Sequence, residues 1–175
     1  MFPDRHDITL VLVPADELLQ TNLRILKHFT PHFDTCLYLS VNFDYNRLIE
    51  TLHRHHLDPK KFFVIDCLGG HRRNGQCISL PSPSALTELG IAMSQAIQSL
   101  PPGQSFLVVD ALSTLVVYNP PDYVARFAHF LISKAKAAGI PTILLAAEKE
   151  MGEPLYAEVA QFCDRVLKPQ QLRVK

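Results

Sequence analysis

The sequence predicts a three-layer α/β/α domain with a mostly parallel central sheet. Five short runs of aliphatic and β-branched residues alternate with segments of helical spacing, the pattern of repeated βαβ units. Runs such as ITLVLV and FLVVD are apolar throughout, as expected of strands covered on both faces. The predicted strands span residues 8–13, 36–41, 62–67, 105–110 and 142–147.

The first two helices are predicted to follow the first two strands. One begins near Asp16, a suitable N-cap residue, and ends before Pro31, which cannot continue a helix. The other follows Asp44 and has apolar residues on one stripe, with charged residues and histidines on the other. Its predicted buried residues are Leu48, Ile49 and Leu52.

Two further helices have clearer sequence signals. In the third, Ser82 is the predicted cap, Pro83 occupies the first helical position, and the PPG segment at 101–103 ends the helix. The fourth runs from Pro121 to about Ala138 and stops at Gly139. Apolar residues recur in both at spacings of three and four, so each is expected to cover the sheet.

The C-terminal part reads as a short helix, EPLYAEVAQF at 153–162, and a last strand, CDRVLK at 163–168. We therefore expect one domain over residues 1–168 and a polar, basic tail over 169–175. The longest irregular stretch runs from residue 69 to 83, with a short strand expected at 77–80. Long loops of this kind often carry function.

Composition narrows the class of partner. Lys plus Arg equal Asp plus Glu at 17 each, so no overall charge favours nucleic acid or a membrane surface. No apolar run approaches the length of a membrane span, and the N-terminal MFPDRHD lacks a signal-peptide core. The four cysteines are far apart, and three lie in or beside apolar runs, which suits reduced thiols in the cytoplasm.

The turn after the first strand is the first place to look for a nucleotide site in an open parallel sheet. A phosphate-binding loop needs glycines, so that several backbone N–H groups approach the anion, and a lysine that neutralises the phosphates. Here the turn reads VPADELLQT, and the first 68 residues of the chain contain no glycine. This argues against a phosphate-binding loop at the first strand.

The chain nevertheless resembles the RecA-like P-loop ATPases, and in particular single-domain relatives of the circadian-clock ATPase KaiC. Laying the loop pattern GxxxxGK[ST] on residues 14–21 places Pro14 and Leu19 at the glycines, Gln20 at the lysine and Thr21 at the magnesium-binding hydroxyl. The run FLVVD, ending in Asp110, resembles the Walker B strand of that family. The resemblance implies a RecA-like sheet with a degenerate Walker A motif.

The departures from the family pattern imply loss of hydrolysis. Active KaiC-like members carry a catalytic carboxylate after the second strand, whereas here that strand runs into Val41, Asn42 and Phe43, with Asp44 close by. Loss of glycines, lysine and carboxylate together removes positioning, charge neutralisation and water activation. The expectation is a pseudo-ATPase without catalytic residues or an obligatory cofactor, serving as a regulatory or scaffold module. Pro14, Gln20, Thr21 and Asp110 are the vestigial cleft candidates.

Several other interpretations stay open. Asp110 at a strand end is expected to cap the following ALSTL turn rather than to hold magnesium. Weak binding of ATP and magnesium, or a residual nucleotidase that uses Asp110 and Glu148, remains an alternative. GGHRRNG, with His71, Arg72 and Arg73, is a candidate anion, nucleic-acid or partner loop, or simply a mobile polar loop.

A zinc site is disfavoured by the spacing of the candidate ligands. Cys67, His71 and Cys77 share one loop, but they form no short pair of the CxxC kind that is typical of structural zinc. No metal is therefore expected. By analogy with the family, which assembles through subunit faces, the predicted partner is a protein, either a second copy or an active homologue.

Overall fold

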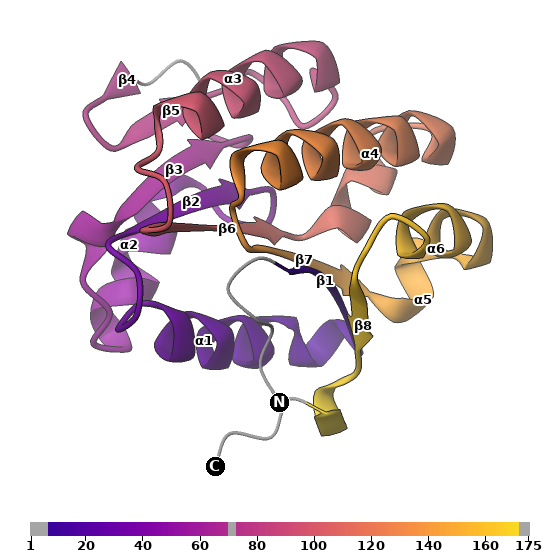
Figure 1. Ribbon diagram of the computed structural model, residues 1–175, viewed down its shortest axis with the longest axis horizontal. Coiled ribbons are helices and arrows are strands. Elements are labelled where there is room, and N and C mark those ends of the chain that lie inside the picture. The colour runs from indigo at the N-terminus through magenta and orange to yellow at the C-terminus, as the bar shows by residue number, and fades with distance from the viewer. Residues whose placement is uncertain (1–6, 70–72, 172–175) are drawn as a thin grey trace.

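The protein forms one eight-stranded sheet covered by helices on both faces (Figure 1). The computed structural model describes residues 7–69 and 73–171. The strands are β1 (Ile8–Val13), β2 (Thr35–Ser40), β3 (Phe62–Asp66), β4 (Arg73–Asn74), β5 (Cys77–Ser79), β6 (Ser105–Asp110), β7 (Thr142–Ala147) and β8 (Arg165–Leu167). Their order is β4-β5-β3-β2-β6-β7-β1-β8, and only the β4–β5 pair of this described sheet is antiparallel.

The helices form the outer layers. The longer helices are α1 (Leu18–Phe29), α2 (Tyr45–Arg54), α3 (Leu86–Ser99), α4 (Pro121–Ala138) and α6 (Glu153–Ala160). In Figure 1, α1 and α2 lie on one face of the sheet, and α3 and α4 lie on the other. Short elements complete the connections: η1 (Ala15–Glu17), η2 (Pro59–Lys61), η3 (Leu112–Val117), α5 (Glu148–Met151) and η4 (Pro169–Gln171). The predicted three-layer α/β/α class is confirmed.

Two apolar cores lie on the two faces of the sheet. Neighbouring residues of one strand contribute to different cores, because successive side chains point to opposite faces. Leu10 packs with the core under α3, α4 and α6, whereas Val11 packs with the core over α1 and α2. Since β1, β6 and β7 are buried along their whole length, their unbroken apolar runs are explained.

Two helices begin where the local sequence predicts them. The α4 helix has the predicted bounds, and Gly139 ends it in the left-handed conformation at φ 65°. The α2 helix begins directly after Asp44, whose side chain accepts a hydrogen bond from the Arg47 backbone N–H at 3.0 Å. Asp44 is thereby the N-cap of α2, and the helix starts where it was predicted.

Two predicted helix starts are wrong. Asp16 does not cap α1: it lies inside the 3₁₀ turn η1, and the residue before α1, Glu17, makes no side-chain capping bond. Ser82 does not cap α3, which begins at Leu86, because the Ser82 hydroxyl accepts from the Ser84 N–H and closes a turn ahead of the helix. Asp16 and Ser82 therefore each belong to a local turn that precedes the helix.

The C-terminal strand is shorter than predicted. The last strand, β8, covers only Arg165–Leu167 of the predicted 163–168, and η4 lies within the predicted tail.

None of the helices in the described ranges combines the length and hydrophobicity of a membrane-spanning segment. All four cysteines are free thiols, and Cys36, Cys67 and Cys77 are buried.

Candidate functional site at the carboxyl edge of the sheet

Two crevices are expected at the carboxyl edge of the sheet, where neighbouring strands send the chain to opposite faces. The chain leaves β1 toward α1, whereas adjacent β7 leads to α5 and α6. Likewise, β2 leads to α2, whereas adjacent β6 leads to η3 and α4. Ligands of open α/β sheets bind at such switch points. The predicted site residues Thr21 and Asp110 belong to these two places.

The connection from β1 to α1 is a tight turn without a phosphate-binding loop. Pro14 follows the strand with φ −56° and ψ 146°, and its carbonyl accepts the Glu17 N–H at 2.9 Å. Proline has no N–H to offer to an anion. Pro14 and Gln20 are exposed, whereas Thr21 is buried and lies on the inner side of α1. The helix therefore begins within a few residues of the strand.

The charge at the start of α1 opposes an anion. Asp16 and Glu17 are exposed carboxylates in the turn that precedes the helix. The positive end of the helix dipole and its unpaired N–H groups attract negative charge, and here the protein itself supplies that charge. A nucleotide phosphate at this position would meet two like charges. Residues 15–17 read ADE, so the two carboxylates beside the helix start are a sequence feature that already argues against a phosphate site.

Protein atoms bridge the crevice between β1 and β7. The α5 helix contacts both η1, after β1, and η3, after β6. The Ala147 N–H, at the end of β7, donates to the Ser113 hydroxyl in η3 at 2.9 Å, and Met151 of α5 is buried. The connections after three strands thus contact one another at the carboxyl edge of the sheet, the edge at which ligands of open α/β sheets bind.

Asp110, at the end of β6, is the centre of a buried polar cluster. Its Oδ2 accepts from the Tyr38 hydroxyl at 2.5 Å and from Asn22 Nδ2 at 3.0 Å. The same Asn22 amide donates to the Tyr38 oxygen at 2.5 Å, so the three side chains form a closed ring. Asp110 is only 3% exposed. This oxygen is thereby held by side chains from α1 and β2.

The other oxygen of Asp110 closes the crevice between β2 and β6. Asn42 Nδ2 donates to Asp110 Oδ1 at 2.9 Å, and Asn42 Oδ1 accepts from the Thr114 hydroxyl at 2.6 Å. The Val41 N–H also donates to the Asp110 carbonyl at 2.8 Å. Asn42 occupies the region where the KaiC-like pattern places a catalytic carboxylate, and an amide cannot serve as a general base there.

Burial dominates the protonation of this cluster. Desolvation raises the pKa of Asp110, although the hydrogen bonds from Tyr38, Asn42 and Asn22 act in the opposite direction. Desolvation also raises the pKa of Tyr38 well above its usual range, with a further contribution from the adjacent carboxylate. The predicted cap of Asp110 on the ALSTL turn is wrong: the Thr114 N–H bonds to the Ala111 carbonyl, and the Asp110 carboxylate accepts from side chains instead.

Glu148 is not part of this cluster. Glu148 Oε1 instead forms an exposed ion pair with Lys168 Nζ at 2.6 Å. His71 and Arg72 lie outside the described residues, and for Arg73 only the backbone is described, in β4 opposite Ile78. Within residues 7–69 and 73–171, no group of three or more His, Cys, Asp or Glu side chains is placed to hold a metal ion.

Four residues of the cluster were missed by sequence reasoning: Asn22, Tyr38, Asn42 and Thr114. Asn22 had a usable signal, since it lies one residue before Leu23 on the apolar side of an amphipathic helix. Tyr38 interrupts the buried run CLYLS with a hydroxyl that needs a partner. Their pairing with Asp110 had no signal, because the partners are 88 and 72 residues apart.

Comparison with known proteins identifies the fold and the family of this chain. A KaiC-like protein, PH0186, from Pyrococcus horikoshii OT3 has a similar structure, with a TM-score of 0.66, 13% identity, and coverage of 95% of this chain and 73% of that one. The uncharacterized PH0321 of the same organism, solved in complex with an unknown peptide, matches with a TM-score of 0.72, 13% identity, and coverage of 95% and 78%. The fold is therefore RecA/KaiC-like.

A family model matches residues 47–169, most of the chain. The chain belongs to DUF7504, a family of unknown function. The matched range includes Asp110 and Thr114 but not Pro14–Asn22. No curated protein matches the sequence. Membership of this family therefore assigns no activity to the chain.

Proposed function

We propose that this protein is a RecA/KaiC-like module that does not hydrolyse ATP and that acts as a regulatory or scaffold element by binding another protein. The observation that carries the proposal is the state of Asp110: both carboxylate oxygens accept hydrogen bonds from buried or half-buried side chains. A Walker B aspartate must instead be free to support a magnesium ion shared with nucleotide phosphates.

The turn after β1 supports the same proposal. Pro14 lacks the N–H that a phosphate-binding loop would offer, and Asp16 and Glu17 place negative charge beside the helix start. Binding ATP here would require repacking of η1 against α5 as well as neutralisation of these carboxylates. Both changes cost free energy that a weak ligand would not offset.

Protein binding is favoured over other non-catalytic roles by one comparison. PH0321, which shares this fold, was crystallised with an unknown peptide. A folded framework that has lost nucleotide chemistry retains its helical outer surfaces, and these are the surfaces that recognise proteins. Three buried free thiols suit a reducing compartment such as the cytoplasm.

Titration with ATP and magnesium tests the proposal. Isothermal titration calorimetry should give no saturable binding in the micromolar range, and a phosphate-release assay should give no release above a protein-free blank. Thr21→Val, which removes the buried hydroxyl at nearly constant volume, should behave like the wild type. Micromolar binding with phosphate release that Thr21→Val or Asp110→Asn abolishes would contradict the proposal.

A further inference from the structure

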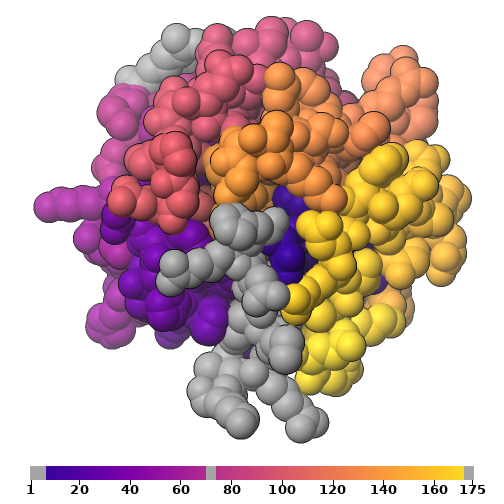
Figure 2. Space-filling model, viewed as in Figure 1, coloured from indigo at the N-terminus to yellow at the C-terminus, as the bar shows by residue number. Residues whose placement is uncertain are grey.

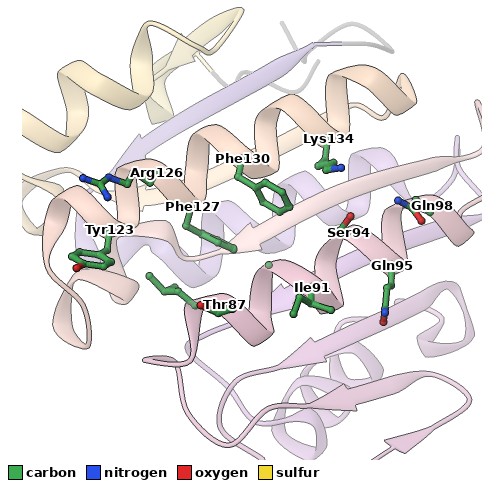
Figure 3. A pocket seen from close by; sticks show the side chains of 12 residues that line it. Thr87, Ile91, Ser94, Gln95, Gln98, Tyr123, Arg126, Phe127, Phe130 and Lys134 are labelled. Atoms are coloured by element: carbon green, nitrogen blue, oxygen red, sulfur yellow. The ribbon is translucent and has the colours of Figure 1, made fainter.

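A groove lies between α3 and α4 on the outer face of the protein. Its volume is about 530 Å³. The two helices adjoin along this face in the space-filling view (Figure 2). In the close view, Phe127 and Phe130 reach from α4 toward α3, which presents Ile91 (Figure 3). Both helices are anchored to the sheet by their opposite, buried sides.

Several apolar side chains that line the groove are exposed to solvent. Ile91 and Tyr123 are each 55% exposed, and Phe130 is 39% exposed. One exposed apolar side chain is ordinary on a soluble protein, but several lining one groove form a patch that is typical of binding sites. Phe127, only 6% exposed, continues the apolar lining inward.

Gly90 keeps this groove deep. It lies inside α3, where glycine is less stable than alanine by about 1 kcal/mol. A Cβ at this position would lie 3.6 Å from the Phe130 ring, an ordinary contact, so alanine would fit. The glycine therefore leaves open a space that a side chain could fill without strain.

The charged side chains that line the groove are all of one sign. Arg126 and Lys134 are the charged residues among the 12 that line it, and both are on α4. The Arg126 guanidinium lies 5.7 Å from the Tyr123 ring centre, and the Lys134 ammonium lies 5.6 Å from the Phe130 ring centre. The cations thus border the apolar rings, and no carboxylate in the lining neutralises them.

We propose that this groove binds a short amphipathic helix of a partner protein that carries apolar side chains flanked by acidic residues. The inference rests on the proposed function and assigns the surface that performs it. From Tyr123 to Lys134 the groove extends about 16 Å along α4, which accommodates about three turns of a helix. Apolar residues of the partner enter the groove, while its carboxylates face Arg126 and Lys134.

A pair of designed peptides tests the charge preference. The first is a fluorescent helical peptide of about four turns, with leucines at i, i+3, i+4 and i+7, glutamates only at the positions that flank this stripe, and alanine or glutamine elsewhere; the second has lysines in place of the glutamates. Fluorescence anisotropy should show binding of the acidic peptide at least about tenfold tighter than of the basic one. The affinity for the acidic peptide should fall as salt is added.

Matched variants locate the binding surface. Arg126→Glu with Lys134→Glu should weaken binding of the acidic peptide by about tenfold or more. Ile91→Glu, an exposed change that leaves the core intact, should do the same by placing a carboxylate on the apolar surface. The control is Arg24→Glu with Lys27→Glu, the same charge change at exposed positions of α1 on the opposite face, which should retain binding.

Four results would overturn the groove proposal. Equal affinity for both peptides would show that Arg126 and Lys134 do not select acidic partners. An equal loss of affinity in the α1 control would show that the peptide responds to the overall charge of the protein rather than to the groove. Self-association by light scattering that Ile91→Glu abolishes would make a second copy the occupant. If the acidic peptide does not bind and ATP is not hydrolysed, the groove proposal is wrong and the proposed function stands. If ATP is hydrolysed and the peptide binds in the groove, the groove proposal stands and the proposed function is wrong.

Discussion

At the scale of single residues, the Tyr38 hydroxyl is central to the buried cluster, because it donates to Asp110 and accepts from Asn22. Tyr38→Phe removes the donor and leaves a buried carboxylate oxygen with one partner fewer. We expect a loss of about 1.5–3 kcal/mol in the free energy of unfolding, measured by urea denaturation. Tyr123→Phe, at an exposed position, is the control and should change stability by less than about 0.5 kcal/mol. Equal effects would show that the cluster adds nothing.

The raised pKa of Asp110 predicts a particular pH dependence. Burial makes the folded protein hold this proton more tightly than the unfolded chain, whose aspartate pKa is about 3.9. The stabilising contribution of Asp110 is therefore complete below the unfolded pKa and is lost as pH rises through the folded pKa. Asp110→Asn does not titrate at this position. The stability of the wild type relative to Asp110→Asn should increase as pH falls from 7 toward about 4.

The comparison with Asp110→Asn is needed because other carboxylates act oppositely. The Ile8 N–H lowers the pKa of Asp164, so its contribution is present above the unfolded pKa and is lost on acidification. Taking the difference between the two proteins cancels that effect. Urea denaturation at a series of pH values gives the difference directly. A difference that stays constant, or that shrinks as pH falls, would contradict a raised pKa at Asp110.

At the scale of elements, the end of β3 depends on one glycine. Asp66 accepts a hydrogen bond from the Tyr45 N–H, which ties β3 to the start of α2, and another from the Leu68 N–H in the turn that follows β3. A Cβ on Gly69 would clash with Asp66 Oδ2, so the carboxylate would have to move. Gly69→Ala should destabilise the protein by about 1–3 kcal/mol in thermal or urea unfolding.

Gly75→Ala is the control for that element. A Cβ there would meet nothing within 4 Å, so we expect a change below about 0.5 kcal/mol. If Gly69→Ala is as mild as Gly75→Ala, the contact of Gly69 with Asp66 does not constrain this turn.

The elements also show what local signals can predict. The α4 helix was placed correctly because Pro121 and Gly139 act through backbone conformation alone. The start of α1 was not, because Asp16 suits a cap in general, whereas here the turn η1 packs against α5 far along the chain. For α4 the cause lies within a few residues and the prediction succeeded, whereas the start of α1 also depends on a tertiary contact.

At the scale of the whole molecule, the fold class followed from the apolar runs and their connections, and the structural likeness to KaiC-like proteins agrees with it. Asp110 could be found as a strand-end residue of a recognisable motif. Its partners could not, because α1, β2 and the segment after β6 meet only in the folded sheet. The groove between α3 and α4 likewise needs two helices placed side by side.

The central claim is that Asp110 belongs to a closed protein cluster rather than to a nucleotide-bound metal site. The most direct test replaces magnesium with paramagnetic manganese and follows the side-chain amide signals of Asn22 and Asn42 by NMR. Both amides donate to Asp110, so a manganese ion beside this carboxylate would broaden them strongly. We predict no more broadening with manganese and ATP than for an exposed amide such as Gln98. Selective broadening of Asn22 and Asn42 that depends on ATP would contradict the account.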